Sequence, residues 1–181
     1  MTALDESPTV TTRRSVTRRR IVVAAGVAAV AAVDLSAKAW AETSLDAPIP
    51  LGPIDLRLAY NPGVAFSMGA GAPTWLVVAV TAAVTAGVAV VTWRAAGEPA
   101  RLRLTALALV LGGATANLVD RARDGVVTDY LHSGWFPTFN LADTTIVTGA
   151  GLLVLAAARH RTPDTTVASE PAPGALGTEP T

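Results

Sequence analysis

The sequence predicts an all-α membrane protein in which four transmembrane helices carry a small β-containing outer region. Its 181 residues are 51% hydrophobic and only 15% charged, and the mean hydropathy of +0.44 is too high for an ordinary soluble domain. Arginines gather at alternate connections between apolar runs, as in multi-pass membrane proteins. The predicted spans are residues 21–41, 73–92, 104–119 and 141–158. They form one domain at 21–160, between a basic N-terminal segment at 1–20 and a polar tail at 161–181, both predicted to be disordered.

The first apolar run has two interpretations. A basic head at 13–20, a short apolar region and the triplet Ala39-Trp40-Ala41 resemble a cleavable signal peptide, including the twin-arginine type. Asp34 and Lys38 argue for a retained span, because they would lie between the apolar region and the cleavage site. They are spaced i,i+4, so a helix pairs them. We predict a retained span, about 30 Å long at a rise of about 1.5 Å per residue, with a structural Asp34/Lys38 pair.

The connection at 42–72 is the first long polar segment. Its stretch 56–69 begins with alternating apolar and polar residues, which predicts a short strand, and Asn61-Pro62-Gly63 predicts a turn. Pro73 suits the first turn of the second span. Trp75 and Trp93 would anchor its two ends at the membrane interface.

The connection at 93–103 is short and contains glycine and proline, so the second and third spans should form a hairpin. The third and fourth spans are short for a bilayer, and flanking arginines are expected to extend them.

The arginine distribution predicts the topology. Ten arginines lie on one side of the predicted membrane: Arg13, Arg14, Arg18, Arg19, Arg20, Arg94, Arg101, Arg103, Arg159 and Arg161. The opposite side has only Arg57, Arg121 and Arg123. Both termini and the 93–103 turn are therefore predicted to be cytoplasmic, and 42–72 and 120–140 to face outward.

The stretch 117–143 carries four carboxylates, Asp120, Asp124, Asp129 and Asp143. Ionisable groups at a membrane boundary are costly and are candidates for function. Asp129 shares one face of a possible strand with Val127 and Leu131, and Asp143 begins the fourth span, where it could instead stabilise the helix N-terminus. Spacing alone does not bring Asp129 and Asp143 together, but the topology places both at the same membrane depth.

Asp120 and Arg121 are adjacent at the outer end of the third span. The expected arrangement is an ion pair at the end of the helix, within a hydrogen-bond network that satisfies buried polar groups. Direct participation in chemistry is the alternative.

If Asp129 and Asp143 meet, they cannot both ionise easily, so one keeps a proton. The charged carboxylate could then activate a water while the protonated one polarises a peptide carbonyl. Other protease chemistries fit poorly, because there is no cysteine, no HExxH and no G-x-S-x-G, and His132-Ser133 matches no nucleophile motif. We expect no metal, no other cofactor and no nucleic-acid partner.

Two further function classes fit an apolar protein with carboxylates. One is a small four-span transporter with a carboxylate proton relay, although such sites usually lie near the bilayer midplane within repeated halves, and no internal repeat is visible. The other is a structural membrane subunit whose polar residues only hold helices together.

Four motifs resemble the lipoprotein signal peptidase family (signal peptidase II). GGATANLVDRARDGVVTDYLH is similar to the family's GGA, Asn, D-R and G-x-V-x-D pattern, and FNLAD is similar to its F-N-x-A-D motif. NPGVAFS resembles its N-x-G-x-A-F element, and Asp34/Lys38 match the polar pair that ends its first span. The resemblance covers about residues 18–160 in order. One departure is Ala116, where the family usually has glycine.

The resemblance implies an aspartyl endopeptidase of the bacterial cytoplasmic membrane, with its active site at the outer face. Its substrates would be diacylglyceryl-modified prolipoproteins, cleaved before the lipid-modified cysteine, and membrane lipids would be its other partners; no oligomer is required. By the same resemblance Asp129 and Asp143 are the catalytic pair. Asn61 and Gly63 map to a substrate-contacting outer loop, and the residues that position the site or contact substrate are Asn117, Asp120, Arg121 and Asn140.

Overall fold

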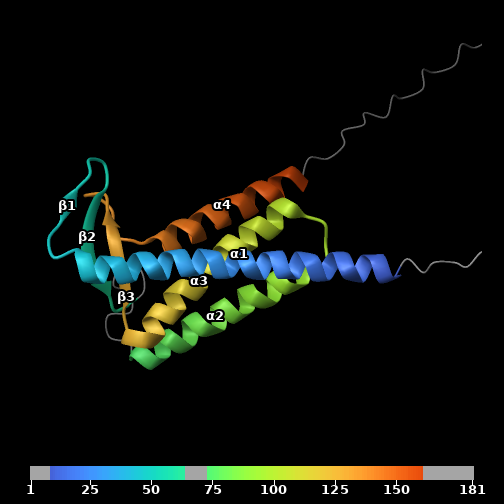
Figure 1. Cartoon of the computed structure of the whole chain (residues 1–181), viewed down its shortest axis with the longest axis horizontal. Helices are drawn as coiled ribbons and strands as arrows, with labels where there is room; N and C mark the ends of the chain where they lie inside the picture. The colour runs from blue at the N-terminus through green and yellow to red at the C-terminus, as the bar shows by residue number, and fades with distance from the viewer. Residues whose placement is uncertain (1–8, 64–72, 161–181) are drawn as a thin grey trace, which may run out of the picture.

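The computed structural model describes residues 9–63 and 73–160, which form four long helices and a small sheet at one end (Figure 1). In chain order the elements are α1 (Thr9–Ser44), β1 (Ile49–Pro50), β2 (Asp55–Asn61), α2 (Thr74–Ala95), α3 (Arg101–Asp124), β3 (Val127–His132) and α4 (Leu141–His160). All four helices are long and apolar enough to cross a membrane. The predicted fold class is confirmed.

Helix α1 begins before the predicted first span, so the prediction of disorder is wrong for residues 9–20, which are helical. The sequence has no proline between Pro8 and Pro48, and arginine is a good helix former, so the apolar helix continues back through the basic stretch. The other segments predicted to be disordered, 1–8 and 161–181, lie outside the described residues.

Helix α3 is also longer than its predicted span of 104–119. It includes the flanking arginines at both ends and stops at Gly125, whose φ of 79° is left-handed. The N–H of Gly125 donates to the carbonyl of Arg121 at 2.8 Å, which closes the last turn. The helix therefore carries Asp120 and Arg121 in its last turns instead of at its end.

Helix α3 is the central helix and packs against α1, α2 and α4. Glycines allow this close approach: a Cβ on Gly112 would lie 2.7 Å from Cβ of Val30 in α1, and one on Gly149 would lie 2.6 Å from the carbonyl oxygen of Ala106. Ala116 is fully buried against Ala31 and Ala142. The α1–α3–α4 interface is thus built of small side chains, and it has room for the Ala116 methyl group.

The three strands form one antiparallel sheet in the order β1-β2-β3. Strands were expected near β2 and β3, and both are present. In the register of β2 with β3, Ala59 pairs with Asp129 and Asn61 pairs with Val127. The Asn61 turn is therefore held beside the strand that carries Asp129, at the end of the bundle where α1 and α3 end and α4 begins (Figure 1).

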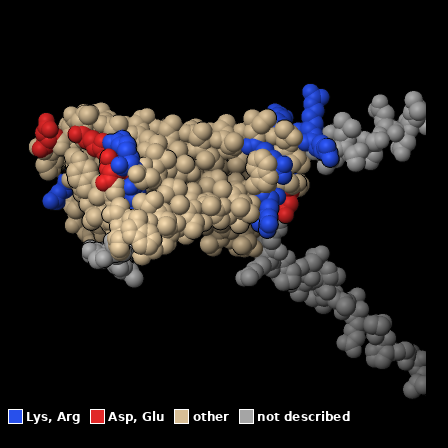
Figure 2. Space-filling view, turned by 90° about the horizontal axis from the view of Figure 1, so that it is seen from below, with Lys and Arg blue, Asp and Glu red and all other residues tan. Residues whose placement is uncertain are grey.

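The charged residues lie at the two ends of the molecule, with an uncharged band between them (Figure 2). The start of α1 and the end of α4 both lie at the end of the bundle opposite the sheet (Figure 1). Arg20 and Trp93 meet there, with the guanidinium 4.1 Å from the ring centroid. At the two ends of α2, Trp75 and Trp93 are 70% and 57% exposed, as interfacial anchors should be.

Candidate active site

The chain between β3 and α4 brings Asp129 and Asp143 to one place. After β3 it loops out and returns at Phe139, which exchanges backbone hydrogen bonds with Leu131 at 2.8 and 2.9 Å. This bridge places the next residue, Asn140, against β3, and Asn140 in turn starts α4. The spacing of residues in the sequence could not predict this backbone bridge, which brings Asp129 and Asp143 close together.

One amide side chain joins the two aspartates. Nδ2 of Asn140 donates to Oδ1 of Asp129 at 2.7 Å, and Oδ1 of Asn140 accepts from the backbone N–H of Asp143 at 2.9 Å. Asn140 is completely buried and Asp129 is 4% exposed. Because the backbone N–H can only donate, the Asn140 oxygen must face Asp143 and its NH₂ must face Asp129.

Asp143 also stabilises the start of α4, as the alternative interpretation expected. Its Oδ2 accepts from the backbone N–H of Asn140 at 3.3 Å, while Asn140 caps the N–H of Asp143. This reciprocal pair is a capping box with Asn140 as the N-cap. Oδ1 of Asp143 is left for a second partner and accepts from Nδ2 of Asn117 at 2.8 Å. The Asp143 side chain therefore both caps α4 and belongs to the polar cluster around Asn117 and Asn140.

Lys38 connects this cluster to helix α1. Its Nζ lies 2.9 Å from Oδ2 of Asp34, 3.2 Å from Oδ2 of Asp120 and 2.7 Å from Oδ1 of Asn117. Lys38 and Asp34 are each 1% exposed, so the predicted i,i+4 pair is present and buried. Buried charges need such pairing and hydrogen bonding.

Backbone amides complete the coordination of both carboxylates paired with Lys38. Oδ1 of Asp34 accepts from the N–H of Ala142 at 2.8 Å, and Oδ2 of Asp120 accepts from the N–H of Thr128 at 2.8 Å. Asp34 thereby ties α1 to α4, and Asp120 ties α3 to β3. The Asp34/Lys38/Asp120 group thus connects four elements, α1, α3, α4 and β3, around the candidate site.

The expected ion pair between Asp120 and Arg121 is wrong. Asp120 pairs with Lys38, and Nη2 of Arg121 donates to the carbonyl of Gly63 at 2.7 Å. Adjacent residues on a helix point in different directions, so neighbours in sequence do not face each other. Arg121 is 7% exposed, and its Nε has no hydrogen-bond partner among the described residues. It holds the Asn61 turn, where the Gly63 N–H also donates to Oδ1 of Asn61 at 3.1 Å.

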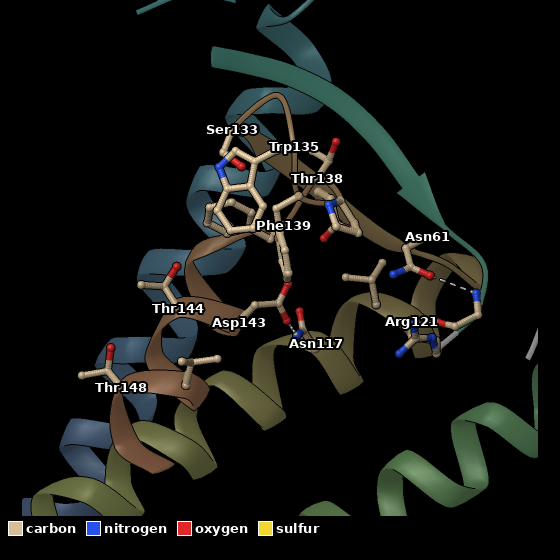
Figure 3. A pocket seen from close by; sticks show the side chains of 16 residues that line it. Asn61, Asn117, Arg121, Ser133, Trp135, Thr138, Phe139, Asp143, Thr144 and Thr148 are labelled. Carbon is tan, nitrogen blue, oxygen red and sulfur yellow. Dashed lines mark hydrogen bonds between the residues drawn. The ribbon is translucent and has the colours of Figure 1, made fainter. Parts of the chain in front are cut away.

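A pocket of about 700 Å³ opens beside the two aspartates (Figure 3). Its polar lining includes Asn61, Asn117, Arg121, Asp129 and Asp143, and its apolar lining includes Val127, Trp135, Phe136, Phe139 and Val147. The pocket runs from the sheet along the first turns of α4, as the labelled Thr144 and Thr148 show (Figure 3). The two carboxylates thus lie beside aromatic and aliphatic side chains in one groove.

Burial and the neighbouring charge of Asp143 raise the pKa of Asp129 to about 7. Hydrogen bonds from the Asn140 and Asn61 side chains and the charge of Lys38 act in the opposite direction. Four carboxylates, those of Asp34, Asp120, Asp129 and Asp143, share this region with the cations Lys38 and Arg121. An excess of negative charge in a buried cluster favours retention of a proton.

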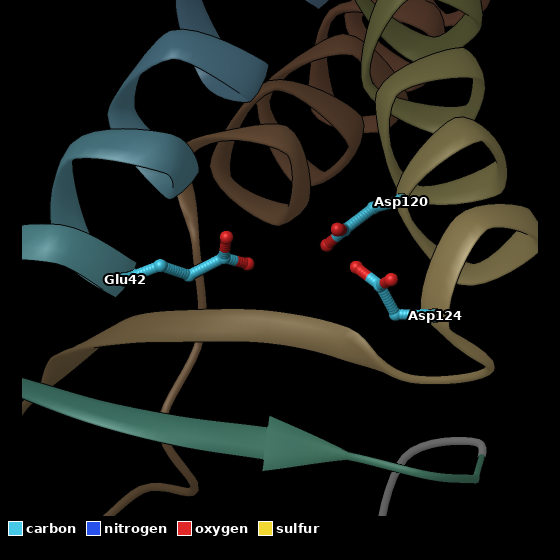
Figure 4. A group of neighbouring side chains, drawn as sticks. All are labelled: Glu42, Asp120 and Asp124. Atoms are coloured by element: carbon cyan, nitrogen blue, oxygen red, sulfur yellow. The ribbon is translucent and has the colours of Figure 1, made fainter.

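A second acidic group lies between the end of α1 and the last turns of α3. Carboxylate oxygens of Glu42, Asp120 and Asp124 lie within 4.8 Å of one another, and Figure 4 shows the three side chains turned together. Arg123 pairs with Glu42 at 3.4 Å and with Asp124 at 2.9 Å, and Lys38 pairs with Asp120. The cations already compensate these charges, and the expectation of a site without metal stays a prediction.

The sequence did not single out two residues that the structure places in these networks, Thr128 and Tyr130. The hydroxyl of Tyr130 accepts from the N–H of Leu141 at 3.3 Å and lies 3.5 Å from Oδ1 of Asp34. Thr128 donates its hydroxyl to Glu42 at 2.7 Å. Alternation in β3 could have indicated that Thr128 and Tyr130 face the helices, opposite to Asp129. His132 interacts with Thr138 at 3.3 Å, and among the described residues no hydrogen bond joins it to Ser133.

Comparison with known proteins identifies the family. The sequence model of a family described as Signal peptidase (SPase) II matches residues 26–159, which is most of the chain and includes every residue of the candidate site. The chain belongs to the signal peptidase II family. This membership makes it a peptidase, and the family together with the four helices long and apolar enough to span a bilayer indicates a bacterial membrane protein.

Similar proteins support the assignment. The lipoprotein signal peptidase of Rhodococcus jostii is 40% identical over 154 residues, covering 76% of this chain and 73% of that protein. The lipoprotein signal peptidase of Yersinia enterocolitica is 39% identical over 132 residues, covering 67% and 78%. A bacterial membrane enzyme solved by the in meso method at 2.3 Å resolution superposes with a TM-score of 0.68 at 20% identity, covering 78% of this chain and 90% of that one. The fold is therefore shared with a known membrane enzyme.

Proposed function

We propose that this peptidase is an aspartyl endopeptidase that removes the signal peptide from diacylglyceryl-modified prolipoproteins. Cleavage falls before the lipid-modified cysteine, and the catalytic pair is Asp129 and Asp143. The proposal rests on the buried residue Asn140, whose side-chain NH₂ donates to the Asp129 carboxylate and whose backbone N–H donates to the Asp143 carboxylate, beside a groove with aromatic and aliphatic lining. The relatives named lipoprotein signal peptidase support the substrate class.

The hydrogen bonds support different roles for the two aspartates. Both oxygens of Asp143 accept hydrogen bonds, from Asn117 and from the Asn140 backbone, and this favours its charged form. Asp129 has its Oδ1 bonded to Asn140, and its raised pKa of about 7 favours a proton near neutral pH. On these contacts we assign Asp143 as the base and Asp129 as the acid of a pair that shares one proton.

Hydrolysis then needs no covalent intermediate. Asp143 takes a proton from a water whose oxygen attacks the scissile carbonyl carbon, while Asp129 gives its proton to the carbonyl oxygen. The resulting tetrahedral diol collapses when the C–N bond breaks. Asp143 returns its proton to the leaving nitrogen, and a diol hydroxyl returns a proton to Asp129, so the products are a carboxylic acid and a free amine.

The surrounding residues position this pair and the substrate. Asn117 and Asn140 orient the carboxylates, and the Asp34/Lys38/Asp120 group holds the helices that carry them. Arg121 fixes the turn of Asn61 and Gly63 at the rim of the groove, where the peptide backbone of a substrate would pass. These are positioning or substrate-contacting roles.

The groove suits a substrate that arrives through the membrane. Its aromatic and aliphatic lining can accept an apolar signal helix and acyl chains, whereas a soluble peptide would gain little from it. The arginine-rich opposite end supports a cytoplasmic location for the termini and an outer location for the site in the bacterial cytoplasmic membrane.

The proposal is tested by incubating purified protein with a prolipoprotein in its diacylglyceryl-modified and unmodified forms. We expect cleavage of the modified form only, and mass spectrometry should find the new N-terminus at the modified cysteine. Cleavage elsewhere, or equal cleavage of both forms, would contradict the substrate assignment. A folded protein that cuts neither form would favour the transporter or structural alternatives.

A further inference from the structure

A second pocket lies at the end of the bundle opposite the candidate active site. It has a volume of about 840 Å³ and is formed by the α2–α3 turn, the start of α3 and the end of α4. Its charged lining consists of Glu98, Arg101, Arg103 and Arg159. Its apolar lining consists of Pro99, Ala100, Leu102, Leu153, Ala156 and Ala157. None of these residues belongs to the catalytic arrangement described above.

Two cations of this pocket have no anionic partner in the part of the chain that the structure describes. Arg103 pairs with Glu98 at 2.9 Å, so these two charges cancel. Arg101 and Arg159 form no ion pair among the described residues, and both are exposed at the mouth of the pocket. Because α3 and α4 pack antiparallel, the start of one helix lies beside the end of the other, and two positive charges remain over the groove.

The floor of the pocket is apolar and is continuous with the membrane-spanning surface. Leu153 packs against the buried cluster of Ala95, Ala96, Leu104 and Leu107, and Ala156 is 9% exposed. Both floor residues lie in α4, a helix long and apolar enough to span the bilayer. A ligand that reaches from the cations to the floor must therefore combine an anionic head with a hydrocarbon chain.

The wider charge distribution of this end agrees with such a ligand. Glu98 is the single acidic residue described there, against nine arginines: Arg13, Arg14, Arg18, Arg19, Arg20, Arg94, Arg101, Arg103 and Arg159. Figure 2 shows basic side chains gathered at this end of the uncharged band. Basic pockets between transmembrane helices bind the head groups of anionic lipids.

We propose that this groove is a binding site for one anionic phospholipid. Arg101 and Arg159 bind the phosphate-bearing head group, and an acyl chain lies along Leu153 and Ala157. The site is independent of the peptidase chemistry at the opposite end. A zwitterionic phospholipid has the same chains but no net charge, and inorganic phosphate has the charge but no chain, so neither should occupy the site well.

The test is native mass spectrometry of the full chain in detergent, titrated with phosphatidylglycerol or with phosphatidylcholine of the same acyl chains. We expect one phosphatidylglycerol to be retained where phosphatidylcholine is not. Arg101→Gln/Arg159→Gln should weaken retention by about tenfold or more. The control Arg13→Gln/Arg14→Gln removes the same charge at the same end outside the groove, and should weaken it by less than about twofold.

A second pair of variants tests the floor without changing charge. Ala157→Trp fills the groove and should abolish preferential retention, whereas Ala158→Trp, one position outside the lining, should not. Three results would each overturn the proposal. They are an equal loss of phosphatidylglycerol retention in the two double-arginine variants, equal retention of the two lipids by wild type, and displacement of the bound lipid by inorganic phosphate. Unchanged melting temperature and unchanged cleavage of prolipoprotein establish that the variants are folded.

Discussion

The Nζ atom of Lys38 lies 2.7 Å from Oδ1 of Asn117, and this contact fixes the direction of the Asn117 amide. An ammonium group can only donate, so the Asn117 oxygen must face Lys38 and the NH₂ must face Asp143, which it reaches at 2.8 Å. A residue of the first helix thereby sets the hydrogen bonding of a carboxylate in the fourth.

Asn117→Ala should lower kcat/KM for prolipoprotein cleavage, because Asp143 loses the donor that holds its charged form in place. A hydrogen bond to a charged group supports a loss of about tenfold to a hundredfold. Thr148→Val is a matched control, since Thr148 lines the same groove without bonding to either aspartate. Equal effects of the two substitutions on kcat/KM would refute the positioning role.

Lys38→Met should destabilise the fold, because it leaves Asp34 and Asp120 buried without their cation. Removing one partner of a buried ion pair costs about 3–5 kcal/mol of the free energy of unfolding. Thermal unfolding in detergent measures the change, and Arg57→Met, an exposed cation at the same end, is the control. Adding Asp120→Asn to Lys38→Met should recover part of the loss; no recovery would argue against an unpaired charge as the cause.

Arg121→Gln should act on substrate affinity more than on stability. Arg121 bonds to the Gly63 carbonyl instead of to Asp120, so its loss frees the turn at the rim of the groove and leaves Asp120 paired with Lys38. We expect KM to rise by about tenfold, with a smaller fall in melting temperature than in Lys38→Met. Arg123→Gln is the exposed control. If the melting temperature of Arg121→Gln fell as low as that of Lys38→Met, the result would argue that Arg121 is the ion-pair partner of Asp120.

The raised pKa of Asp129 makes folding stability depend on pH. The folded-state pKa of about 7 lies above that of the unfolded chain, so the folded state prefers the protonated form. Its contribution to stability is fully present below about pH 4 and is lost as the pH rises through about 7. Asp129→Asn, which cannot ionise, should therefore melt higher than wild type at about pH 8, with a smaller difference at about pH 5. If the difference in melting temperature between Asp129→Asn and wild type were the same at both pH values, or larger at about pH 5, the raised pKa of Asp129 would be contradicted.

Much of the fold could be predicted from the sequence because its causes are local. Apolar runs and their flanking arginines predict four spans, and alternation predicts the strands that became β2 and β3. The helix ends were less predictable, because the basic stretch before residue 21 has helical propensity and continues α1 back to Thr9.

The site depended on contacts that the sequence does not encode at short range. The resemblance to a family indicated Asp129 and Asp143. The contacts that bring these two residues close together are the backbone bridge at Phe139 and the hydrogen bonds of Asn140. The partner of Asp120 is Lys38, far away along the chain in α1, and only the packing of α1 against α3 shows it. Arg121 was the expected partner because it is next to Asp120 in the sequence, but adjacent residues on a helix point in different directions.

The measurement that tests the central claim most directly is cleavage of a diacylglyceryl-modified prolipoprotein by wild type, Asp129→Asn and Asp143→Asn. Asp124→Asn, an exposed carboxylate at the same end of the molecule, is the control. We predict that each of the first two substitutions lowers the rate by at least about a hundredfold, with melting temperatures that show a folded protein, and that Asp124→Asn cleaves like wild type. Activity that survives in either Asp129→Asn or Asp143→Asn would contradict a catalytic pair.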